Sequence, residues 1–471
     1  MTSPLVLHHD VLFPSNIHER DIARRLYGTV ANLPIVSPHG HTDPKWFAQN
    51  KPFANPAELL IQPDHYVYRM LYSQGVTLEQ LGINKIGQQQ STANPEAVWQ
   101  LFADHFYLFQ GTPSYYWLNY VFVNTFNLDV KLESSTAKHY YQVINDKLNT
   151  PEFLPRALFE RYNIEVIATT ECPTDDLKYH QQILDSGWAG KVITAFRPDA
   201  VIDAEHESFL TKIDKLSHVS GLDCREYSDY IEALRQRRVY FKKMGATSTD
   251  HGHSTPRTAD LTESQAKGLF HKLISGEFDA SDAELFRAHM LMKMAEMSLE
   301  DGLVMQIHPG CYRNHNKQVF TEFGRDKGAD LPKPTEYNEA LKPLLDKYGN
   351  DPRLNIILFT LDETVYSREL GPLAGHYPCL KLGPAWWFHD SPEGMTRFRR
   401  ATTEVAGFYN TVGFNDDTRA FLSIPARHDM ARRMDCSYLA ELVARHQIEE
   451  DQAMVIAKDL AYTLAKTAYK L

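Results

Sequence analysis

Short runs of apolar and β-branched residues recur along the chain, separated by longer segments with helical periodicity. These runs, bounded mostly by Gly, Pro or Asn, predict strands at 33–37, 164–170, 191–197, 245–250, 302–308, 354–360, 378–382 and 408–415. The run at 245–250 has the weakest strand pattern. Amphipathic segments such as 283–302 lie between the runs and predict helices. Strands that alternate with helices indicate a parallel sheet, and eight of them favour a closed (β/α)8, TIM-type barrel of the α/β class.

The spacing between the first two predicted strands is far larger than one crossover helix requires. Within it, 97–109 and 115–126 are aromatic segments with a helical pattern, whose rings we expect in a core. We therefore expect four parts. They are 1–41, an N-terminal segment with barrel strand 1; 42–163, a mainly helical insertion over one end of the barrel; 164–436, the rest of the barrel; and 437–471, C-terminal helices packed on it.

Charge and composition exclude several classes of protein. The 471 residues include 49 Lys and Arg against 60 Asp and Glu, a net charge of −11, which argues against a nucleic-acid partner. The start has no signal-peptide pattern, and the longest apolar runs, such as 356–359, are far shorter than the roughly 20 residues that span a bilayer. Five scattered cysteines without a Cys–Xaa–Xaa–Cys motif predict reduced thiols. A cytoplasmic protein without a membrane partner is expected.

A His–Xaa–His pair follows the first predicted strand. In an extended chain residues i and i+2 point to the same side, so His39 and His41 can both face the barrel interior. Two converging imidazoles are a natural half-site for a divalent metal. An isolated pair of this kind is more often a hydrogen-bonded loop pair, but its position at the end of strand one favours the metal.

Two aspartates follow the last predicted strand. Because strand eight adjoins strand one in a closed barrel, Asp416 or Asp417 can reach the two histidines. A carboxylate that completes a two-histidine site leaves positions open for substrate, as a catalytic metal requires. The alternative is a helix N-cap, and neighbouring aspartates can serve both purposes.

Further histidines follow other strands. His308, after strand five, is either a third imidazole near the metal or a hydrogen-bond donor to substrate. His251 and His253, after strand four, form a rival pair that we rank below the first. Lys242 and Lys243 precede strand four, so no lysine stands where a carbamate bridging two metals is expected. A mononuclear site is favoured.

Two other side chains suit a substrate site. Arg197, after strand three, can grip a carboxylate or a polyol; its alternative is a surface ion pair. Tyr66, in the insertion, can polarise a carbonyl, although a buried aromatic residue is the simpler reading. Motifs for a phosphate loop, a dinucleotide fold or a serine nucleophile are absent from the sequence, so no nucleotide cofactor is expected.

Seven motifs, taken together, resemble one known family. They are HGHTDP after strand one, DHYxxR in the insertion, RPD, DHG, HPG…RNHN, GPAWWFHDSPEGM at 383–395 and DDTRAFLSIPARHD at 416–429. In order and spacing, over essentially the whole chain, the sequence is similar to the uronate isomerase (glucuronate isomerase) family of the amidohydrolase superfamily.

The resemblance implies reversible aldose–ketose isomerisation of hexuronates, by C2-to-C1 proton transfer through an enediol. D-glucuronate would become D-fructuronate, and D-galacturonate would become D-tagaturonate. His39, His41 and Asp417 would hold one divalent metal, with zinc the first expectation, and the open-chain substrate would bind that metal through its carboxylate and a neighbouring hydroxyl.

The resemblance also implies residue roles. Asp417 would move the proton, Tyr66 would hydrogen-bond the C1 carbonyl, and Arg419 would bind the C2 and C3 hydroxyls. Substrate contacts are expected from Arg197, His65, His308 and Trp386.

Two other functions fit part of the pattern. A metal-bound water would serve a mononuclear metal-dependent hydrolase of the amidohydrolase type equally well, so this is the alternative. A sensor that binds sugar acids without turnover is a weaker candidate, because no helix-turn-helix with basic flanks is present in the sequence. The expected partner is a small hexuronate, and a homo-oligomer is left open.

Overall fold

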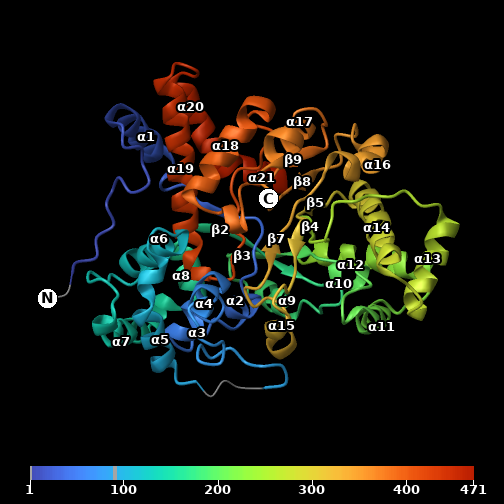
Figure 1. Ribbon diagram of the computed structural model, residues 1–471, viewed down its shortest axis with the longest axis horizontal. Helices are drawn as coiled ribbons and strands as arrows, with labels where there is room; N and C mark the ends of the chain where they lie inside the picture. Colours follow the sequence, from blue (N-terminus) through green and yellow to red (C-terminus); the bar gives the residue numbers. More distant parts are fainter. Residues whose placement is uncertain (1–2, 89–92) are drawn as a thin grey trace.

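A curved parallel sheet of seven strands forms the centre of the protein (Figure 1). The computed structural model describes residues 3–88 and 93–471. The strands, in spatial order, are β1 (Ile35–Ser37), β2 (Ile164–Glu171), β3 (Lys191–Phe196), β4 (Ser248–His251), β5 (Val304–Ile307), β8 (Ile356–Leu358) and β9 (Leu380–Leu382). Every neighbouring pair is parallel, so the α/β barrel-like fold and seven of the eight predicted strands are confirmed.

The eighth predicted strand is wrong as a regular strand. Residues 408–415 make a single parallel bridge, between Thr411 and Leu382 of β9, and Gly413 has a φ of +75°, outside the extended region. The segment nevertheless occupies the eighth position. It bonds to β9 through Val412 N and Leu382 O (3.0 Å), and further along Thr418 O accepts a bond of 3.0 Å from His41 N, after β1. Backbone contacts therefore run around the whole barrel.

Short helices fill the long segment between β1 and β2 and group together at the lower left of Figure 1. They are α2 (Pro44–Gln49), α3 (Pro56–Leu60), α4 (His65–Tyr72), α5 (Pro95–Asp104), α6 (Pro113–Tyr120), α7 (Ala137–Leu148) and α8 (Pro155–Arg161). Proline at the first turn and an Asn, Asp or Thr cap start several of them. Their predicted aromatic core is confirmed, with Trp99, Phe102 and Phe122 fully buried.

The remaining helices surround the sheet. After β2 come α9 (Lys178–Asp185), α10 (Asp199–Ile202), α11 (Phe209–Ser220), α12 (Tyr227–Lys243), α13 (Glu263–Ser275), α14 (Ala280–Asp301), α15 (Lys317–Phe323), α16 (Asn338–Tyr348), α17 (Gly371–Ala374) and α18 (Pro392–Ala406). The helix predicted at 283–302 corresponds to α14. A small antiparallel pair, β6 (Cys311–Tyr312) and β7 (Leu331–Pro332), lies outside the main sheet.

Helices from the first and last parts of the chain pack together on one side of the barrel. Helix α1 (Ile17–Val30) packs against α19 (Ile424–Ala444) and α20 (Glu450–Lys458), at the upper left of Figure 1. The boundary that we expected at 437 falls inside α19, because its buried face continues through Leu439 and Ala440 without a break.

The last helix, α21 (Leu464–Tyr469), closes the amino-terminal end of the barrel. Ala465 packs against inward-facing residues of β1, β2 and β3. The hydroxyl of Tyr469 donates to Gln306 Oε1 (2.9 Å) and accepts from Asn415 Nδ2 (3.2 Å). This end of the barrel is therefore filled by the chain itself, and the opposite end remains for a site.

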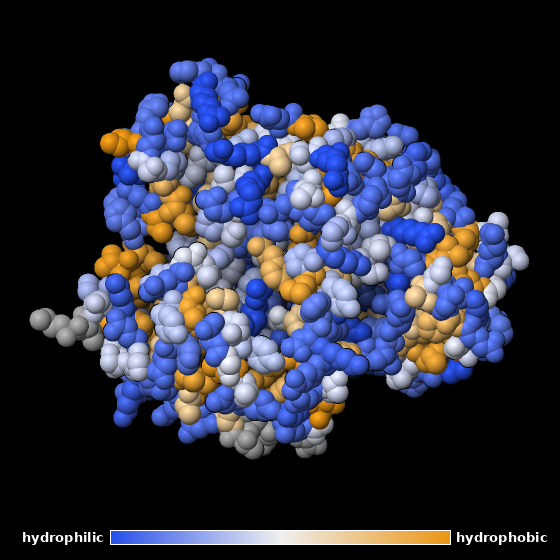
Figure 2. Space-filling view, in the orientation of Figure 1, coloured by the Kyte–Doolittle hydropathy of each residue, from blue (hydrophilic) through white to orange (hydrophobic). Residues whose placement is uncertain are grey.

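Across the described ranges, no helix is both long enough and apolar enough to cross a membrane. The face drawn in Figure 2 is mostly hydrophilic, with hydrophobic side chains in scattered patches.

We expect Tyr469→Ala to destabilise the protein strongly, because it removes a fully buried ring and leaves two buried polar groups without their partner. Loss of a core aromatic residue costs about 3–5 kcal/mol, which should lower the melting temperature by several degrees. Tyr107→Ala, at a site where 61% of the residue is exposed, is the matched control. Equal melting temperatures for the two variants would contradict the plug role of α21.

Candidate functional site

One cavity of about 380 Å³ opens at the carboxyl ends of the strands, a volume within the range of small-molecule sites, about 300–1,000 Å³. All the predicted site residues line it: His39, His41, His65, Tyr66, Arg197, His308, Trp386, Asp417 and Arg419. They come from the loops after β1, β3, β5 and β9, from the insertion, and from the loop that follows the eighth segment (408–415). The fold thus brings together side chains that are up to 380 positions apart in sequence (419 − 39).

His39, His41 and Asp417 converge at the base of this cavity. The Nε2 atoms of His39 and His41 lie 3.4 and 3.2 Å from Asp417 Oδ1, and one ligand atom from each residue lies within 4.8 Å of the others. Asp417 has a φ of +38°, a left-handed conformation that Asp tolerates better than most residues. This conformation and the bond between His41 N and Thr418 O bring the carboxylate beside the imidazoles.

These three residues fit a divalent metal. Ligands about 2.0–2.2 Å from a tetrahedral zinc lie about 3.3–3.6 Å apart, close to the two measured separations. Asp417 Oδ1 is buried without a hydrogen-bond partner among the described residues, although it faces two ring nitrogens. A cation between the three atoms would satisfy that oxygen, and three protein ligands would leave a position open.

Electrostatics favour an ionised Asp417. Burial opposes its charge, but His39 and His41 outweigh burial and hold the pKa of the carboxyl well below its usual range. Burial likewise opposes a charge on His39, yet Asp250 and Asp417 keep its pKa above the ordinary value. The pKa of His41 is lowered by burial. Asp417 thus offers a carboxylate and His41 a neutral imidazole near neutral pH, whereas a cation that binds His39 must displace the proton from the ring nitrogen it takes.

A buried charged group forms the adjacent wall. His308 Nε2 lies 2.6 Å from Asp250 Oδ1, and Arg197 Nη1 lies 3.3 Å from Asp250 Oδ2. Asp250 is completely buried; His308, Arg197 and His39 hold its pKa well below the usual range against the effect of burial. Asp250 had no role assigned from the sequence, although its place at the carboxyl end of β4 was a signal.

Helix α4 presents His65 and Tyr66 to the cavity. Asp64 caps the helix and accepts a bond of 2.9 Å from Tyr66 N. Burial raises the pKa of the Tyr66 phenol, so it remains a hydrogen-bond donor. Burial lowers the pKa of His65 to about 3, and its Nε2 has no hydrogen-bond partner among the described residues. Arg427 lies over the Tyr66 ring at 5.2 Å and fixes its position.

The outer rim contains a group that sequence analysis missed. Arg419 Nη2 lies 3.2 Å from Asp326 Oδ2, and the backbone oxygen of Asp326 accepts a bond of 2.7 Å from Tyr68. The only sequence signal was a glycine-rich stretch at 324–328. Trp386 is fixed deeper in the cavity, since its Nε1 donates to Thr360 O at 3.1 Å and its ring packs on His308.

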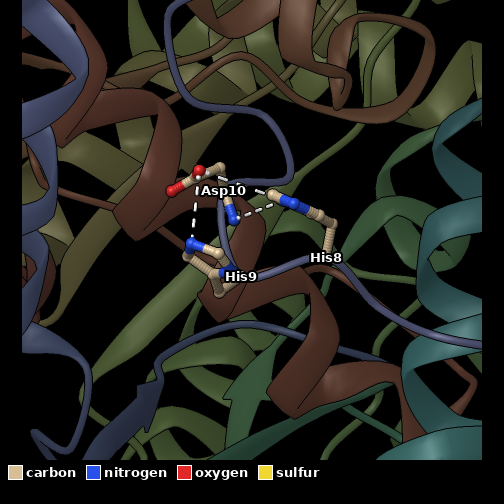
Figure 3. Close-up of side chains that lie close together, drawn as sticks. All are labelled: His8, His9 and Asp10. Atoms are coloured by element: carbon tan, nitrogen blue, oxygen red, sulfur yellow. Dashed lines mark hydrogen bonds and ion pairs between the residues drawn. The ribbon is translucent and has the colours of Figure 1, made fainter. Parts of the chain in front are cut away.

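Two other groups of candidate ligands occur in the described part of the chain. Asp199, His251 and His253 form one beside the cavity wall. His8, His9 and Asp10 form the other, on the surface (Figure 3). Arg24 binds both carboxylate oxygens of Asp10, at 2.6 and 2.5 Å, so the negative charge of that carboxylate is already paired.

A parallel α/β barrel with a His–Xaa–His pair and an aspartate at its carboxyl end defines a class of enzymes that hold a divalent metal at this position. The sequence model of the glucuronate isomerase family matches residues 11–469. The chain belongs to the glucuronate isomerase family.

Individual relatives agree with this assignment. A protein of Xanthomonas axonopodis pv. citri named uronate isomerase is 61% identical, over 100% of both chains. The crystal structure of glucuronate isomerase from Caulobacter crescentus is 58% identical and has a TM-score of 0.98, covering 99% of this chain and 97% of the other. That of uronate isomerase from Thermotoga maritima is 27% identical, with a TM-score of 0.92 and coverage of 98% and 99%.

We expect Gly252→Ala to damage the cavity wall. An added Cβ would lie 2.6 Å from Arg197 Nη2, 2.7 Å from His308 Cε1 and 2.9 Å from Asp199 Oδ2, and such overpacking costs about 1–3 kcal/mol. Gly268→Ala in α13 is the control, because its Cβ would meet nothing within 4 Å. The first variant should lower the melting temperature and the second should raise it slightly; the same sign for both would refute the packing argument.

Proposed function

We propose that the protein catalyses the reversible aldose–ketose isomerisation of D-glucuronate to D-fructuronate and of D-galacturonate to D-tagaturonate. The observation that carries the proposal is the convergence of three candidate metal ligands with the Tyr66 phenol and the guanidinium groups of Arg197 and Arg419 in one cavity. An aldose–ketose shift needs a base for C2–H, a donor to the C1 oxygen and groups that bind hydroxyls and a carboxylate. The cavity contains a residue suited to each of these roles, and the chain belongs to the glucuronate isomerase family.

His39, His41 and Asp417 would hold one divalent metal, with zinc the best match to two imidazoles and one carboxylate. When bound, the metal supplies a Lewis acid for the substrate carboxylate and neighbouring hydroxyl. The donor set does not require a second ion for this chemistry.

Asp417 is the proposed base for C2–H. It is ionised near neutral pH, because the neighbouring histidines hold its pKa low. A carboxylate of low pKa is a weak base, so C2–H must be acidified by polarisation of the C1 carbonyl. The proton then passes from C2 to C1 through an enediol.

Tyr66 is the proposed donor to the C1 carbonyl, since its phenol stays protonated. We assign the C2 and C3 hydroxyls to Arg419, which keeps 38% of its side chain exposed beside Asp326. Arg197, His65, His308 and Trp386 contact the rest of the substrate, each facing the same cavity.

The proposed setting is the cytoplasm. Five free cysteines, four of them buried, are typical of proteins that remain in a reducing compartment. For homo-oligomer contacts we propose the outer surface of the insertion (42–163), where Tyr72 and Ile86 are exposed.

Turnover of D-glucuronate tests the proposal directly. The native protein with metal should form ketose, lose this activity after chelation and regain it with zinc. In D₂O, deuterium should enter C1 of the product whenever the transferred proton exchanges with solvent. Binding without turnover would indicate a sensor, and hydrolysis of an amide or lactone without isomerisation would indicate the metal-dependent hydrolase.

Asp417→Asn tests the base. The amide keeps the size of the side chain and can still offer an oxygen to the metal, but it accepts a proton very poorly. We expect ketose formation and C2–H exchange to be lost while substrate still binds. Metal content is measured in the same sample. If the fully metal-loaded variant isomerises at a near-native rate, Asp417 is not the base, and Asp416 is the next residue to test.

Tyr66→Phe tests carbonyl polarisation, because it keeps the ring and removes the hydroxyl. Loss of a donor that acts on the developing enediolate should lower kcat by about 10²-fold or more and change KM little. Steady-state kinetics measure kcat and KM of this variant and of the control Tyr107→Phe, which changes an exposed tyrosine. A rise in KM at unchanged kcat would mean that Tyr66 holds only the ground state.

A further inference from the structure

Asp199, His251 and His253 form a second group of ligand atoms beside the catalytic cavity. Asp199 begins α10 after β3, while His251 ends β4 and His253 follows it. One ligand atom from each lies within 4.8 Å of the others, and His253 Nε2 is 3.7 Å from Asp199 Oδ1. Gly252 lies between the two imidazoles and lines the cavity, as Asp199 does. The group is therefore a neighbour of the catalytic triad but shares no residue with it.

The two imidazoles lack partners that a buried polar group requires. Both ring nitrogens of His253 and Nδ1 of His251 are buried without a hydrogen bond among the described residues. His251 is fully buried and His253 is 4% exposed. Buried nitrogens without partners are rare in native proteins and indicate a missing ligand, such as an ion or a water.

The partner of His251 sets which nitrogen can bind a cation. Nε2 of His251 lies 2.9 Å from Thr249 Oγ1, and that hydroxyl is 3.5 Å from Val304 O. If the hydroxyl donates to the carbonyl, Nε2–H donates to the hydroxyl, and Nδ1 keeps its lone pair. A second hydrogen bond that fixes the tautomer of a ligand histidine is a common feature of metal sites.

Charges around His253 favour a cation. Asp199, Asp203 and Glu284 act on it as negative groups, with Arg287 as the opposing positive one. Arg287 is itself bound by Asp203, Glu205 and Glu284 at 2.6–2.8 Å. Arg197 Nε lies 3.1 Å from Asp199 Oδ2, which leaves Asp199 Oδ1 facing the histidine.

We propose that Asp199, His251 and His253 bind a second divalent cation, of the zinc type, with a structural role. Two neutral imidazoles and one carboxylate form a donor set that suits zinc. A cation would satisfy three lone pairs at once, whereas a water molecule can donate only two hydrogens. The 3.7 Å between His253 Nε2 and Asp199 Oδ1 is close to the separation of about 3.3–3.6 Å between two ligands of one zinc. Entry is through the cavity, which Asp199 lines.

The cation would act by fixing Asp199. That carboxylate accepts from Gly252 N (3.2 and 3.0 Å) and from Arg197 Nε, so an anchored Asp199 holds the cavity wall and Arg197 in place. The proposal goes beyond the isomerase function and does not depend on it.

Zinc stoichiometry tests the proposal. The full-length protein is stripped with a chelator, reloaded with zinc, desalted and measured by mass spectrometry of the metal. We expect about two zinc ions per chain in the native protein, and about one in each of His253→Ala and His39→Ala. The double variant should retain close to none. A native protein that binds one zinc, all of it lost in His39→Ala, would overturn the second site while leaving the proposed function intact.

Controls separate this site from the surface cluster and from misfolding. His8→Ala removes an exposed histidine of the group in Figure 3 and should keep the native zinc content. Loss of one zinc in His8→Ala would place the second ion at the surface and refute the proposal. His253→Gln retains a neutral polar side chain and should also lose one zinc if His253→Ala does not fold. Native zinc content in a folded His253→Gln protein would contradict the proposal equally.

Discussion

The backbone hydrogen bond from His41 N to Thr418 O joins the first and last segments of the barrel, and the geometry of the candidate metal site depends on it. The bond brings a histidine pair and an aspartate that are separated by most of the chain to within 3.2–3.4 Å. The eighth segment forms no regular strand pairing, so its position depends on this hydrogen bond and on its backbone bonds to β9. The left-handed backbone of Asp417 follows from the same closure.

Buried charge is concentrated at this end of the barrel. His308, Arg197 and His39 hold the pKa of the Asp250 carboxyl well below its usual range, and His39 and His41 do the same for Asp417. Such a network is costly unless each member is satisfied. Its members lie on different strands, so it also couples the positions of the strand ends. A substrate with one carboxylate and several hydroxyls suits this environment.

Arg197 links the two groups of candidate metal ligands in and beside the cavity. It contacts Asp250, which neighbours the first group, and Asp199, which belongs to the second, and Gly252 packs against its guanidinium. The absence of a side chain at residue 252 is what allows this approach. A structural change at either group therefore affects the other through the Arg197 guanidinium and the backbone of Gly252.

The sequence by itself determined the strands and helices that are specified by neighbouring residues. Strands such as 164–171 and 191–196 are short runs of mostly apolar and β-branched residues, and helix 280–301 has an aspartate cap at its start and a glycine at its end. The proximity of His39 to His41 also followed from two-residue spacing. The whole-chain pattern of motifs was sufficient to indicate the family.

Tertiary structure decided those features that depend on contacts between residues far apart in the sequence. Whether 408–415 forms a ladder depends on Gly413 and on its neighbours across the barrel, which local propensity does not encode. Position 437, where we expected a boundary, lies inside α19, whose buried face extends on both sides of it. The contact between Asp250 and His308 and the group around His253 arise only when loops from different strands meet. Sequence pattern therefore determines which residues stand at strand ends, and chain closure determines which of them touch.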